Sequence, residues 1–381
     1  MLLSAALIVR NEAENLARCL PPLASFADDI VVVDTGSDDE TRAVARSAGA
    51  RVFEFQWSDD YAAARNEALR HCRGEWVLSV DADEIYRPCP REELSSILGS
   101  PSTVAGSTWF RIRDGFTPYR RVRLFRNHPL IRFAGIIHEN VLAGLDRYRE
   151  RYGGDAGDSP LFADHVGYDG DQREKNLRNL PILLRCAEQE PGKVIVWCHL
   201  ANVYASLGEA EKADGAWRRA VAVTGRCNGR PSLYDSVAYL GLIEWQLSRD
   251  EDAQPLVSEA RDLFPGNLHL LWYEGRLLMR QGSYREATAR FEELLAARRR
   301  EDFLERYGNP ADDWDHWFGY DERLFHVLSF ESLATCHFRL GRYAESLRFL
   351  DLAARREPAR GIELRKCLCR NLLQVAGAGT R

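Results

Sequence analysis

The first half of the chain alternates short apolar runs with longer segments in which apolar residues recur every three or four positions. The apolar runs are rich in β-branched residues and predict strands at residues 5–9, 30–33, 51–55 and 76–80. The segments between them have helical spacing and predict helices at residues 12–23, 39–48 and 61–72. Parallel strands need such crossover connections, which cover both faces of their sheet. We therefore predict an α/β domain built on a Rossmann-like, mostly parallel sheet.

The second half of the chain carries a repeated helical pattern instead. Small and large apolar residues recur around a turn in four units, at residues 197–208, 240–265, 271–291 and 333–353. Three of these turns contain glycine, and the unit at 240–265 has Arg249 at the position that we align with it. Such spacing lets antiparallel helix pairs nest and stack on one another, and it resembles tetratricopeptide repeats.

These patterns divide the chain into two domains, which agrees with its length, because 381 residues are too many for one ordinary core. We place the α/β domain at residues 1–170 and the all-α repeat domain at residues 171–381. A segment rich in aromatic and acidic residues, 302–321, interrupts the repeat period. We interpret it as a loop or insert on one face of the repeats.

Composition restricts the partners and the location that we expect. The net charge of −6 argues against nucleic-acid binding, which needs a basic surface. No apolar run approaches the ~20 residues of a membrane-spanning helix, and the apolar N-terminal segment is typical of a first strand rather than of a secretory signal. The nine cysteines are scattered, as in proteins that keep their thiols reduced. We therefore expect no nucleic-acid partner, no transmembrane segment and a cytoplasmic location.

Polar residues follow three of the predicted strands, at the sheet edge where α/β proteins bind ligands. They are Arg10-Asn11-Glu12, the segment from Asp34 to Asp38, and Asp81-Ala82-Asp83-Glu84. Two carboxylates one residue apart suit a divalent cation that neutralises a departing diphosphate, because hard cations prefer oxygen ligands. The alternative for Asp81 and Asp83 is an acidic turn or a helix N-cap.

Two further residues have both a ligand-binding and a structural interpretation. Asp34 follows a buried strand, where its carboxylate can accept a hydrogen bond from a base N–H; alternatively, it caps the next predicted helix. Arg65 lies on a predicted helix, from which it reaches a base or a diphosphate. Its alternative is a surface ion pair with Glu67 or Asp60, which is the commoner fate of a helical arginine.

Taken in order, four segments of the first half resemble the motifs of family 2 glycosyltransferases, which have a GT-A fold. The segments are Leu7-Ile8-Val9-Arg10-Asn11-Glu12, Val32-Val33-Asp34-Thr35-Gly36-Ser37, Asp60-Tyr61-Ala62-Ala63-Ala64-Arg65-Asn66 and Val80-Asp81-Ala82-Asp83-Glu84. Three later segments resemble the branch of that family that is fused to tetratricopeptide repeats, a broad type that includes the S-glycosyltransferases of glycopeptide bacteriocins. These segments are Arg123-Leu124-Phe125-Arg126, Gly135-Ile136-Ile137-His138-Glu139 and His165-Val166-Gly167-Tyr168.

The resemblance implies a nucleotide-sugar site at these motifs. Its implied members are Val9, Asn11, Glu12, Asp34, Arg65, Asp81, Ala82 and Asp83. The resemblance places Asp34 and Glu12 at the nucleobase and ribose, with Arg65 alongside them. It places Asp81 near the ribose.

The resemblance also implies a divalent cation, Mn²⁺ or Mg²⁺, bound by Asp83. His165 is similar to the histidine that completes metal coordination in several GT-A enzymes, and a neutral imidazole is an acceptable Mn²⁺ ligand. We expect His165 to lie past the last element of the sheet. Its alternative is a histidine that is hydrogen-bonded at the domain junction.

The family inverts the anomeric carbon, which requires a base for the proton of the acceptor. Glu139 is our first candidate for this base, although an ion pair with an arginine of residues 111–132 is an equally good interpretation. We expect His138 to orient the site, and Glu84 is the second candidate for the base. The arginines of residues 111–132 have three interpretations of their own. They form a solvated face of a strand, they contact the diphosphate, or they bind an anionic acceptor.

These features predict an inverting glycosyltransferase that moves a hexose or N-acetylhexosamine from a UDP-sugar, with a divalent metal, to an acceptor hydroxyl or thiol. Stacked repeats form an extended concave surface, which favours a peptide or protein acceptor, or homodimerisation. Transfer to a lipid-linked or lipopolysaccharide-type glycan is an alternative, and so is a non-catalytic repeat scaffold. A nucleotidyltransferase is disfavoured, because the loop after the first strand lacks the glycines of that class.

Overall fold

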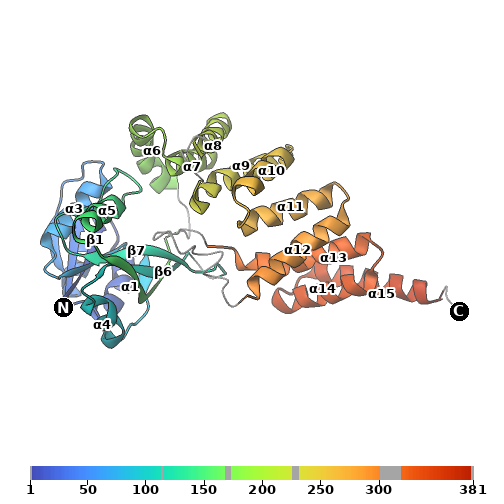
Figure 1. Cartoon of the computed structure of the whole chain (residues 1–381), viewed down its shortest axis with the longest axis horizontal. Coiled ribbons are helices and arrows are strands. Elements are labelled where there is room, and N and C mark those ends of the chain that lie inside the picture. The colour runs from blue at the N-terminus through green and yellow to red at the C-terminus, as the bar shows by residue number, and fades with distance from the viewer. Residues whose placement is uncertain (1, 113–114, 168–172, 225–230, 301–318, 379–381) are drawn as a thin grey trace. The chain divides into compact units, whose positions relative to one another are not determined.

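The computed structural model describes residues 2–112, 115–167, 173–224, 231–300 and 319–378. The described residues fall into two compact units, and Figure 1 labels many of their elements. The first unit contains the sheet and continues to Ala216, apart from Gly115–Thr117, which belong to the second unit. The second unit continues from Trp217. The units therefore divide later in the chain than residue 171, where we placed the domain boundary.

The first unit contains eight strands and eight helices among its described residues, the last helix crossing the unit boundary. In chain order they are β1 (Leu3–Val9), α1 (Ala13–Ala24), β2 (Asp29–Asp34), α2 (Thr41–Ser47), β3 (Arg51–Glu54), α3 (Tyr61–His71), β4 (Trp76–Val80), β5 (Glu84–Tyr86), α4 (Arg91–Gly99), β6 (Thr103–Arg111), β7 (Tyr119–Arg126), α5 (Leu142–Tyr152), β8 (Asp155–His165), α6 (Arg173–Gln189), α7 (Val194–Ser206) and α8 (Ala210–Thr224). The seven elements predicted up to residue 80 are all present, and their bounds differ from the prediction by no more than two residues.

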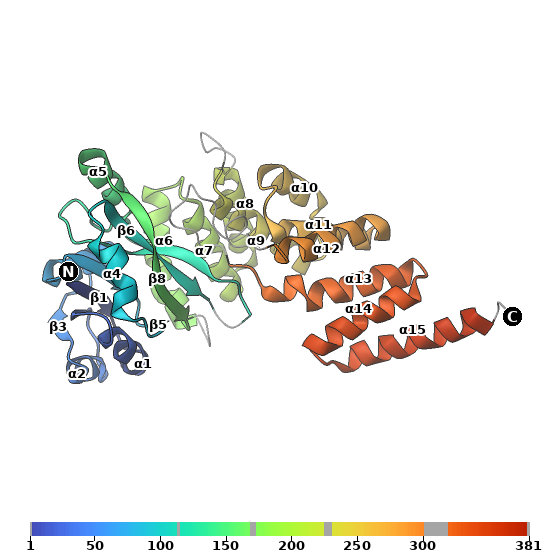
Figure 2. The ribbon, with the colours of Figure 1, turned by 60° about the horizontal axis from the view of Figure 1, so that its bottom comes forward.

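The sheet is mixed, with strand order β3-β2-β1-β4-β7-β6-β8-β5. Figure 2 labels β1, β3, β5, β6 and β8 of this sheet. The predicted strands β1 to β4 are parallel to one another, and Val9 of β1 pairs with Asp34 of β2. The second half of the sheet is less regular: β7 is antiparallel to β4 and β6, and β5 is antiparallel to β8. The α/β fold with a Rossmann-like sheet is therefore confirmed, and its parallel part carries the polar strand ends.

Alternate residues of each central strand enter two different cores, as the twofold period of a strand requires. On one face Leu7 and Val32 pack against α1 and α4. On the other face Ala6 and Val31 pack against α3 and α5. Both faces are apolar because both are covered by helices, which leaves the strand ends as the accessible polar edge.

The second unit consists of helix pairs. Its elements are η1 (Leu233–Asp235), α9 (Ser236–Ser248), α10 (Gln254–Leu263), α11 (Leu268–Arg280), α12 (Tyr284–Arg298), η3 (Glu322–Phe325), α13 (Val327–Arg339), α14 (Tyr343–Arg356) and α15 (Arg360–Ala378). The all-α repeat architecture is confirmed. Most of the expected insert at 302–321 lies outside the described residues, which resume at residue 319.

The turn inside each helix pair uses a left-handed backbone. Gly282 and Gly341 adopt positive φ angles of 82° and 74° between their helices. In the degenerate unit the equivalent residue is Asp250, at φ 59°, and not Arg249 as our alignment placed it. The amide of Asp250 donates to the carbonyl of Leu247 at 3.3 Å, as Gly282 does three residues back in its own turn. Aspartate tolerates this conformation better than most residues, so the turn survives without glycine.

Within the described ranges, no helix combines the length and the apolar character needed to cross a bilayer. The eight cysteines of those ranges are all free thiols.

Candidate active site

The ends of β1, β2 and β4 bring the predicted polar residues to one edge of the sheet. A cleft of about 290 Å³ opens at this edge. Nine of the residues predicted for the site line it: Val9, Glu12, Arg65, Asp81, Ala82, Asp83, His138, Glu139 and His165. Three predicted residues lie outside its lining: Asn11, Asp34 and Glu84.

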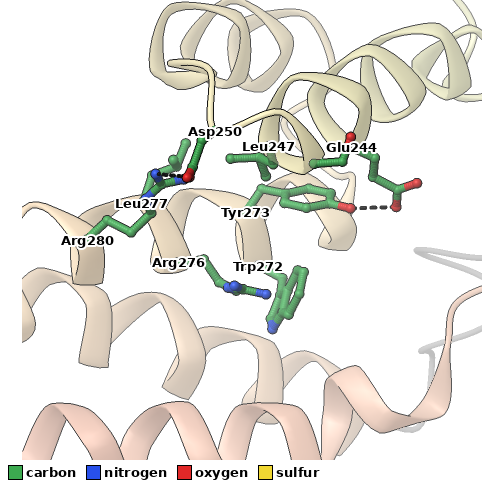
Figure 3. Close-up of a pocket in the computed structure, with 9 residues that line it drawn as sticks. Glu244, Leu247, Asp250, Trp272, Tyr273, Arg276, Leu277 and Arg280 are labelled. Atoms are coloured by element: carbon green, nitrogen blue, oxygen red, sulfur yellow. Dashed lines mark hydrogen bonds and ion pairs between the residues drawn. The ribbon is translucent and has the colours of Figure 1, made fainter. Parts of the chain in front are cut away.

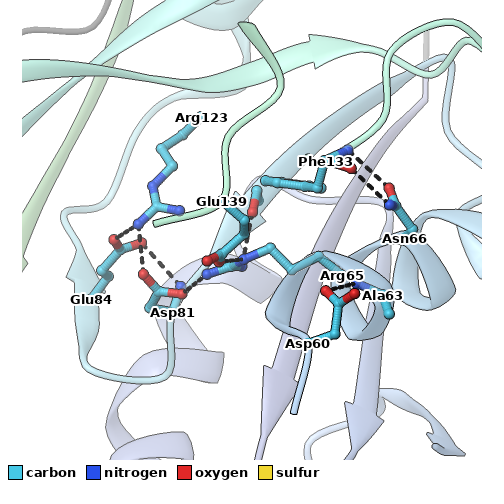
Figure 4. Close-up of polar contacts among 10 residues, drawn as sticks. Asp60, Ala63, Arg65, Asn66, Asp81, Glu84, Arg123, Phe133 and Glu139 are labelled. Atoms are coloured by element: carbon cyan, nitrogen blue, oxygen red, sulfur yellow. Dashed lines mark hydrogen bonds and ion pairs between the residues drawn. The ribbon is translucent and has the colours of Figure 1, made fainter. Parts of the chain in front are cut away.

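A network of buried charges forms the floor of the cleft (Figure 4). Arg65 of α3 pairs with the carboxylates of Asp81 and Glu139, and it donates to Ser79 Oγ at 3.1 Å. Arg123 of β7 donates to Asp81 Oδ2 at 2.6 Å and also pairs with Glu84. Each Asp81 oxygen therefore has an arginine partner. Although burial opposes it, Arg123 and Arg65 hold the pKa of Asp81 well below its ordinary value, so the residue is ionised.

The position of Arg65 follows from its helix. Asp60 caps α3 by accepting a hydrogen bond from the amide of Ala63 at 2.9 Å, which fixes where the helix begins. Arg65 then points into the unit and is only 7% exposed. Neither of its expected surface partners is used, because Asp60 caps the helix and Glu67 pairs with Arg70. The surface interpretation of Arg65 is therefore wrong.

Asp83 and His165 meet at the rim of the cleft. His165 is the last residue of β8, a strand that we did not predict, and it pairs in register with Glu84 of β5. Its Nε2 lies 3.3 Å from Asp83 Oδ2. Our expectation that His165 lies beyond the sheet is wrong. A described partner of His165 is therefore the acidic motif itself.

The pair has the donor chemistry of a divalent-cation site that is completed by a ligand. One carboxylate and one imidazole are acceptable ligands for Mn²⁺, and Mg²⁺ and similar ions commonly take their remaining ligands from substrate phosphates and water. The described residues contain no group of three acidic, histidine or cysteine side chains placed to cage a metal by themselves. Asp83 and His165 therefore fit a cation that is shared with a phosphate, but not a cation held by protein alone.

Gly167 packs directly against the Asp83 carboxylate. A Cβ atom built on Gly167 would lie 1.7 Å from Asp83 Oδ2, which is far inside van der Waals contact. The amide of Val166 donates to the carbonyl of Asp83 at 2.9 Å. The segment after β8 therefore fixes the place of Asp83 from one side.

Glu84, the second candidate for the base, is sealed beneath the cleft. Its side chain has no exposure, and it accepts from Arg123 and from the backbone amide of Asp81 at 3.0 Å. Burial raises the pKa of Glu84 to about 7, although Arg123 opposes this. Glu139, in contrast, lines the cleft, and its arginine partner is Arg65 rather than one of residues 111–132.

Asp34 and Asn11 build the turns beside the cleft. Asp34 Oδ1 accepts from the amides of Gly36 and Ser37 at 3.1 and 3.0 Å. Its buried Oδ2 finds no hydrogen-bond partner among the described residues. Asn11 has a left-handed backbone, φ 56°, and its side chain accepts from the amide of Asp38 at 3.0 Å. Asp34 thus has one carboxylate oxygen without a described hydrogen-bond partner. This oxygen lies near the cleft, because the next residue, Thr35, lines the cleft.

His138 is held in a costly conformation at the cleft. Its backbone is left-handed at φ 55°, and its buried Nε2 lacks a hydrogen-bond partner in the described part of the chain. Its ring contacts the ring of His199 of α7, with centroids 4.2 Å apart. Burial, His199 and nearby cations lower the pKa of His138 well below its ordinary value, so the imidazole is neutral. Burial also lowers the pKa of His199, to about 4.

Sequence reasoning missed the wall of the cleft that α6 and α7 supply. Its residues are Lys175, Arg178, Asn179 and His199. We had assigned these helices to the repeats, but they belong to the first compact unit. The only signal in the sequence was the spacing of 175, 178 and 179, which places three polar side chains on one helix face.

The arginines between residues 111 and 132 are mostly engaged within the first unit. Arg111 donates to Asp164 at 2.9 Å, and Arg126 donates to the carbonyl of Ser100 at 2.6 Å. Arg121 and Arg123 are both buried, at 9% and 4% exposure, and both line the cleft. For the described arginines of this cluster, the interpretation as a solvated strand face is therefore wrong.

Comparison with known proteins finds a family match in the first unit. Residues 4–158 match the family described as Glycosyl transferase family 2, a span that contains Asp83 and Glu139 and ends before His165. A TPR repeat-containing protein of Synechococcus elongatus is 34% identical over 252 residues, which are 63% of this chain and 61% of that protein.

Two named glycosyltransferases are also similar to the chain. The lipopolysaccharide core biosynthesis glycosyltransferase LpsC of Rhizobium meliloti is 36% identical over 140 residues, 34% of this chain and 50% of that protein. The SPbeta prophage-derived glycosyltransferase SunS of Bacillus subtilis is 23% identical over 152 residues, 37% of this chain and 35% of that protein. The chain covers less than two thirds of the length of each of these three relatives. It contains a family 2 glycosyl transferase domain, which occupies residues 4–158.

Proposed function

We propose that the first unit binds a nucleotide sugar, with UDP as the nucleotide, and transfers the sugar with inversion to an acceptor hydroxyl or thiol. The observation that carries the proposal is the Asp83–His165 pair at the rim of the cleft, in which Asp83 lies within the residues that match the glycosyl transferase family 2 model and His165 follows them. A Mn²⁺ or Mg²⁺ ion on this pair would neutralise the negative charge of the departing diphosphate.

The turn after β2 supports the proposal that the nucleotide binds at this end of the cleft. Asp34 does not line the cleft, but its buried Oδ2 has no described hydrogen-bond partner and would accept from a ring N–H, such as uracil offers, once the turn moves to expose it. Glu12 lines the cleft nearby and is oriented by Asn15, whose amide donates to Glu12 Oε2 at 2.6 Å. A carboxylate held in this way suits a ribose hydroxyl.

Glu139 supports the proposal that sugar transfer takes place in this cleft. A base must reach the acceptor proton from the cleft, which Glu139 can do and the sealed Glu84 cannot. Arg65 fixes the Glu139 carboxylate and joins it to Asp81, so the position of the base is coupled to the motif that ends β4. In this proposal Glu139 takes the proton, and Arg65 and Arg123 are positioning residues.

The acceptor is proposed to be a peptide or protein that the repeat unit recruits. Between α9 and α11 that unit has a cavity of about 540 Å³ with both apolar and charged walls (Figure 3). Tyr273 donates to Glu244 at 2.5 Å, and Arg276 lies over the ring of Trp272 at 4.9 Å. Ordered charged and aromatic groups around a groove suit an extended chain better than a bare apolar patch does.

A glycan of the lipopolysaccharide type is the second candidate acceptor, favoured by the likeness to LpsC. Assays on glycolipid and on peptide acceptors distinguish the two. Homodimerisation through the repeats and a cytoplasmic location stay predictions.

The direct test is a panel of nucleotide sugars, each measured for thermal stabilisation with and without Mn²⁺. A ligand that binds the folded state raises its melting temperature, by an amount set by concentration and affinity. We expect one donor to stabilise the protein only with the cation, and Asp83→Ala to lose both this stabilisation and the release of UDP. Normal UDP release by Asp83→Ala with Mn²⁺ present would remove the assignment.

A further inference from the structure

The helices α6 and α7 are held against α3 and the loop that contains Ile137 and His138, as part of the first unit. Tyr61 Oη donates to Asn179 Oδ1 at 3.1 Å, and Lys193 Nζ donates to the carbonyl of Ile137 at 3.3 Å. The rings of His138 and His199 add a third contact. The cleft wall that these helices form is therefore attached at several points along its length.

This wall carries two cationic side chains that have no carboxylate partner among the described residues. Lys175 and Arg178 line the cleft, one helical turn apart on α6, and both side chains are exposed. Neither forms an ion pair with any residue that the structure describes. Two buried arginines of the floor differ, because Arg65 and Arg123 each form ion pairs with two carboxylates.

The two cationic side chains of the wall face the acidic side of the cleft. Burial raises the pKa of Glu12, and Asp83 adds to this, whereas Lys175 and Arg178 act in the opposite direction on the same carboxyl. Their charges are thus felt at Glu12 without a direct contact. The space between these groups is where a ligand that binds Asp83 or Glu12 would extend.

The charge of a nucleoside diphosphate exceeds what the rim can neutralise. A released diphosphate carries about three negative charges, and one divalent cation on Asp83 offsets only part of them. Arg65 and Arg123 of the floor offer little more, since both are paired with carboxylates. Phosphate oxygens favour charge-assisted hydrogen bonds from lysine and arginine, which are stronger than neutral ones.

We propose that Lys175 and Arg178 of α6 form a cationic clamp on the diphosphate of the nucleotide sugar, in the same cleft as Asp83 and His165. The inference rests on the proposed function and deepens it. It makes the first helix after the α/β fold a part of the donor site. Release of the product would then require the diphosphate to separate from α6 as well as from the strand ends.

The test compares nucleotide binding by Lys175→Ala, Arg178→Ala and the double variant, using isothermal titration calorimetry with Mn²⁺ present. The ligands are UDP and UMP, or the diphosphate and monophosphate of whichever nucleoside the wild-type protein binds. Lys212→Ala is the matched control, because Lys212 is an exposed lysine of α8 that pairs with Glu209 outside the cleft. Lys175→Arg and Arg178→Lys keep the charge and test whether charge alone is required.

We expect the diphosphate affinity to fall about 3- to 10-fold for each single variant and about 10- to 100-fold for the double variant, as partly exposed charge pairs allow. The monophosphate should lose less, the charge-conserving variants should keep most of the affinity, and Lys212→Ala should match wild type. Diphosphate binding by the double variant equal to wild type would overturn the clamp. A wild-type protein that binds no nucleoside diphosphate would refute the proposed function together with the clamp.

Discussion

Gly167→Ala tests the packing that holds the cation ligand in place. The added Cβ would lie 1.7 Å from Asp83 Oδ2 and 2.6 Å from Asp83 Cγ. Gly167 is not among the glycines with a positive φ, so alanine does not strain the backbone itself. The substitution therefore acts on the Asp83 carboxylate, which must turn or retreat by well over an ångström to restore normal contact.

The size of the effect follows from that displacement. Metal–ligand distances in proteins are kept within about 0.2 Å, and a misplacement of about 1 Å at a reacting centre costs about 100-fold in rate. We therefore expect Gly167→Ala to weaken Mn²⁺ binding at least about 10-fold and to lower kcat/KM about 100-fold. Global stability should change little, because the carboxylate is at the rim and its side chain is 20% exposed.

The assay is Mn²⁺ titration in the presence of UDP, followed by UDP release under the same conditions. Gly157→Ala is the control, because the nearest atom to its added Cβ lies at 3.4 Å, an ordinary contact. Melting temperatures without ligand show whether each variant is folded. A folded Gly167→Ala protein with wild-type Mn²⁺ affinity and turnover would show that Asp83 does not hold the cation.

Two further substitutions test the floor of the cleft. Glu139→Gln should leave UDP affinity intact, because the amide keeps the shape of the side chain, while transfer falls about 100-fold or more for lack of a base; wild-type transfer rates would exclude Glu139 from that role. Arg123→Leu leaves Glu84 buried without its cation and removes one partner of Asp81, so the free energy of unfolding in urea should fall by about 3–5 kcal/mol. The half-exposed Arg87, paired with Asp164, is the reference: Arg87→Ala should cost at most about 1 kcal/mol, and equal losses for the two variants would contradict the network.

The parallel half of the sheet could be predicted because its strands are buried on both faces. Runs such as Ile30-Val31-Val32-Val33 leave no other environment open to them, and their ends then define the ligand edge. The strand β8 escaped prediction for the opposite reason. Only Ser159, Leu161 and Ala163 of its eleven residues are buried, and Pro160 lies between them, which argues against a strand.

The partners within the site could not be read from sequence, because they come from distant positions. Arg65 and Glu139 are 74 residues apart, and nothing local indicates that they meet. The arginines 121 and 123 were correctly placed on one strand face, but which face is buried depends on the strands around it. The wall formed by α6 was missed because its helical spacing looks the same in a repeat as in a cleft.

The division into two compact units has a practical consequence for every melting experiment on this chain. Units with separate cores need not unfold together, so heating can give two steps instead of one. A nucleotide that occupies the cleft binds the first unit, so its stabilisation is expected in the step of that unit. The unfolding step of the helices beyond Trp217 then serves as an internal reference. The ligand-induced shift in the melting temperature of the first unit can be measured against it in a single sample.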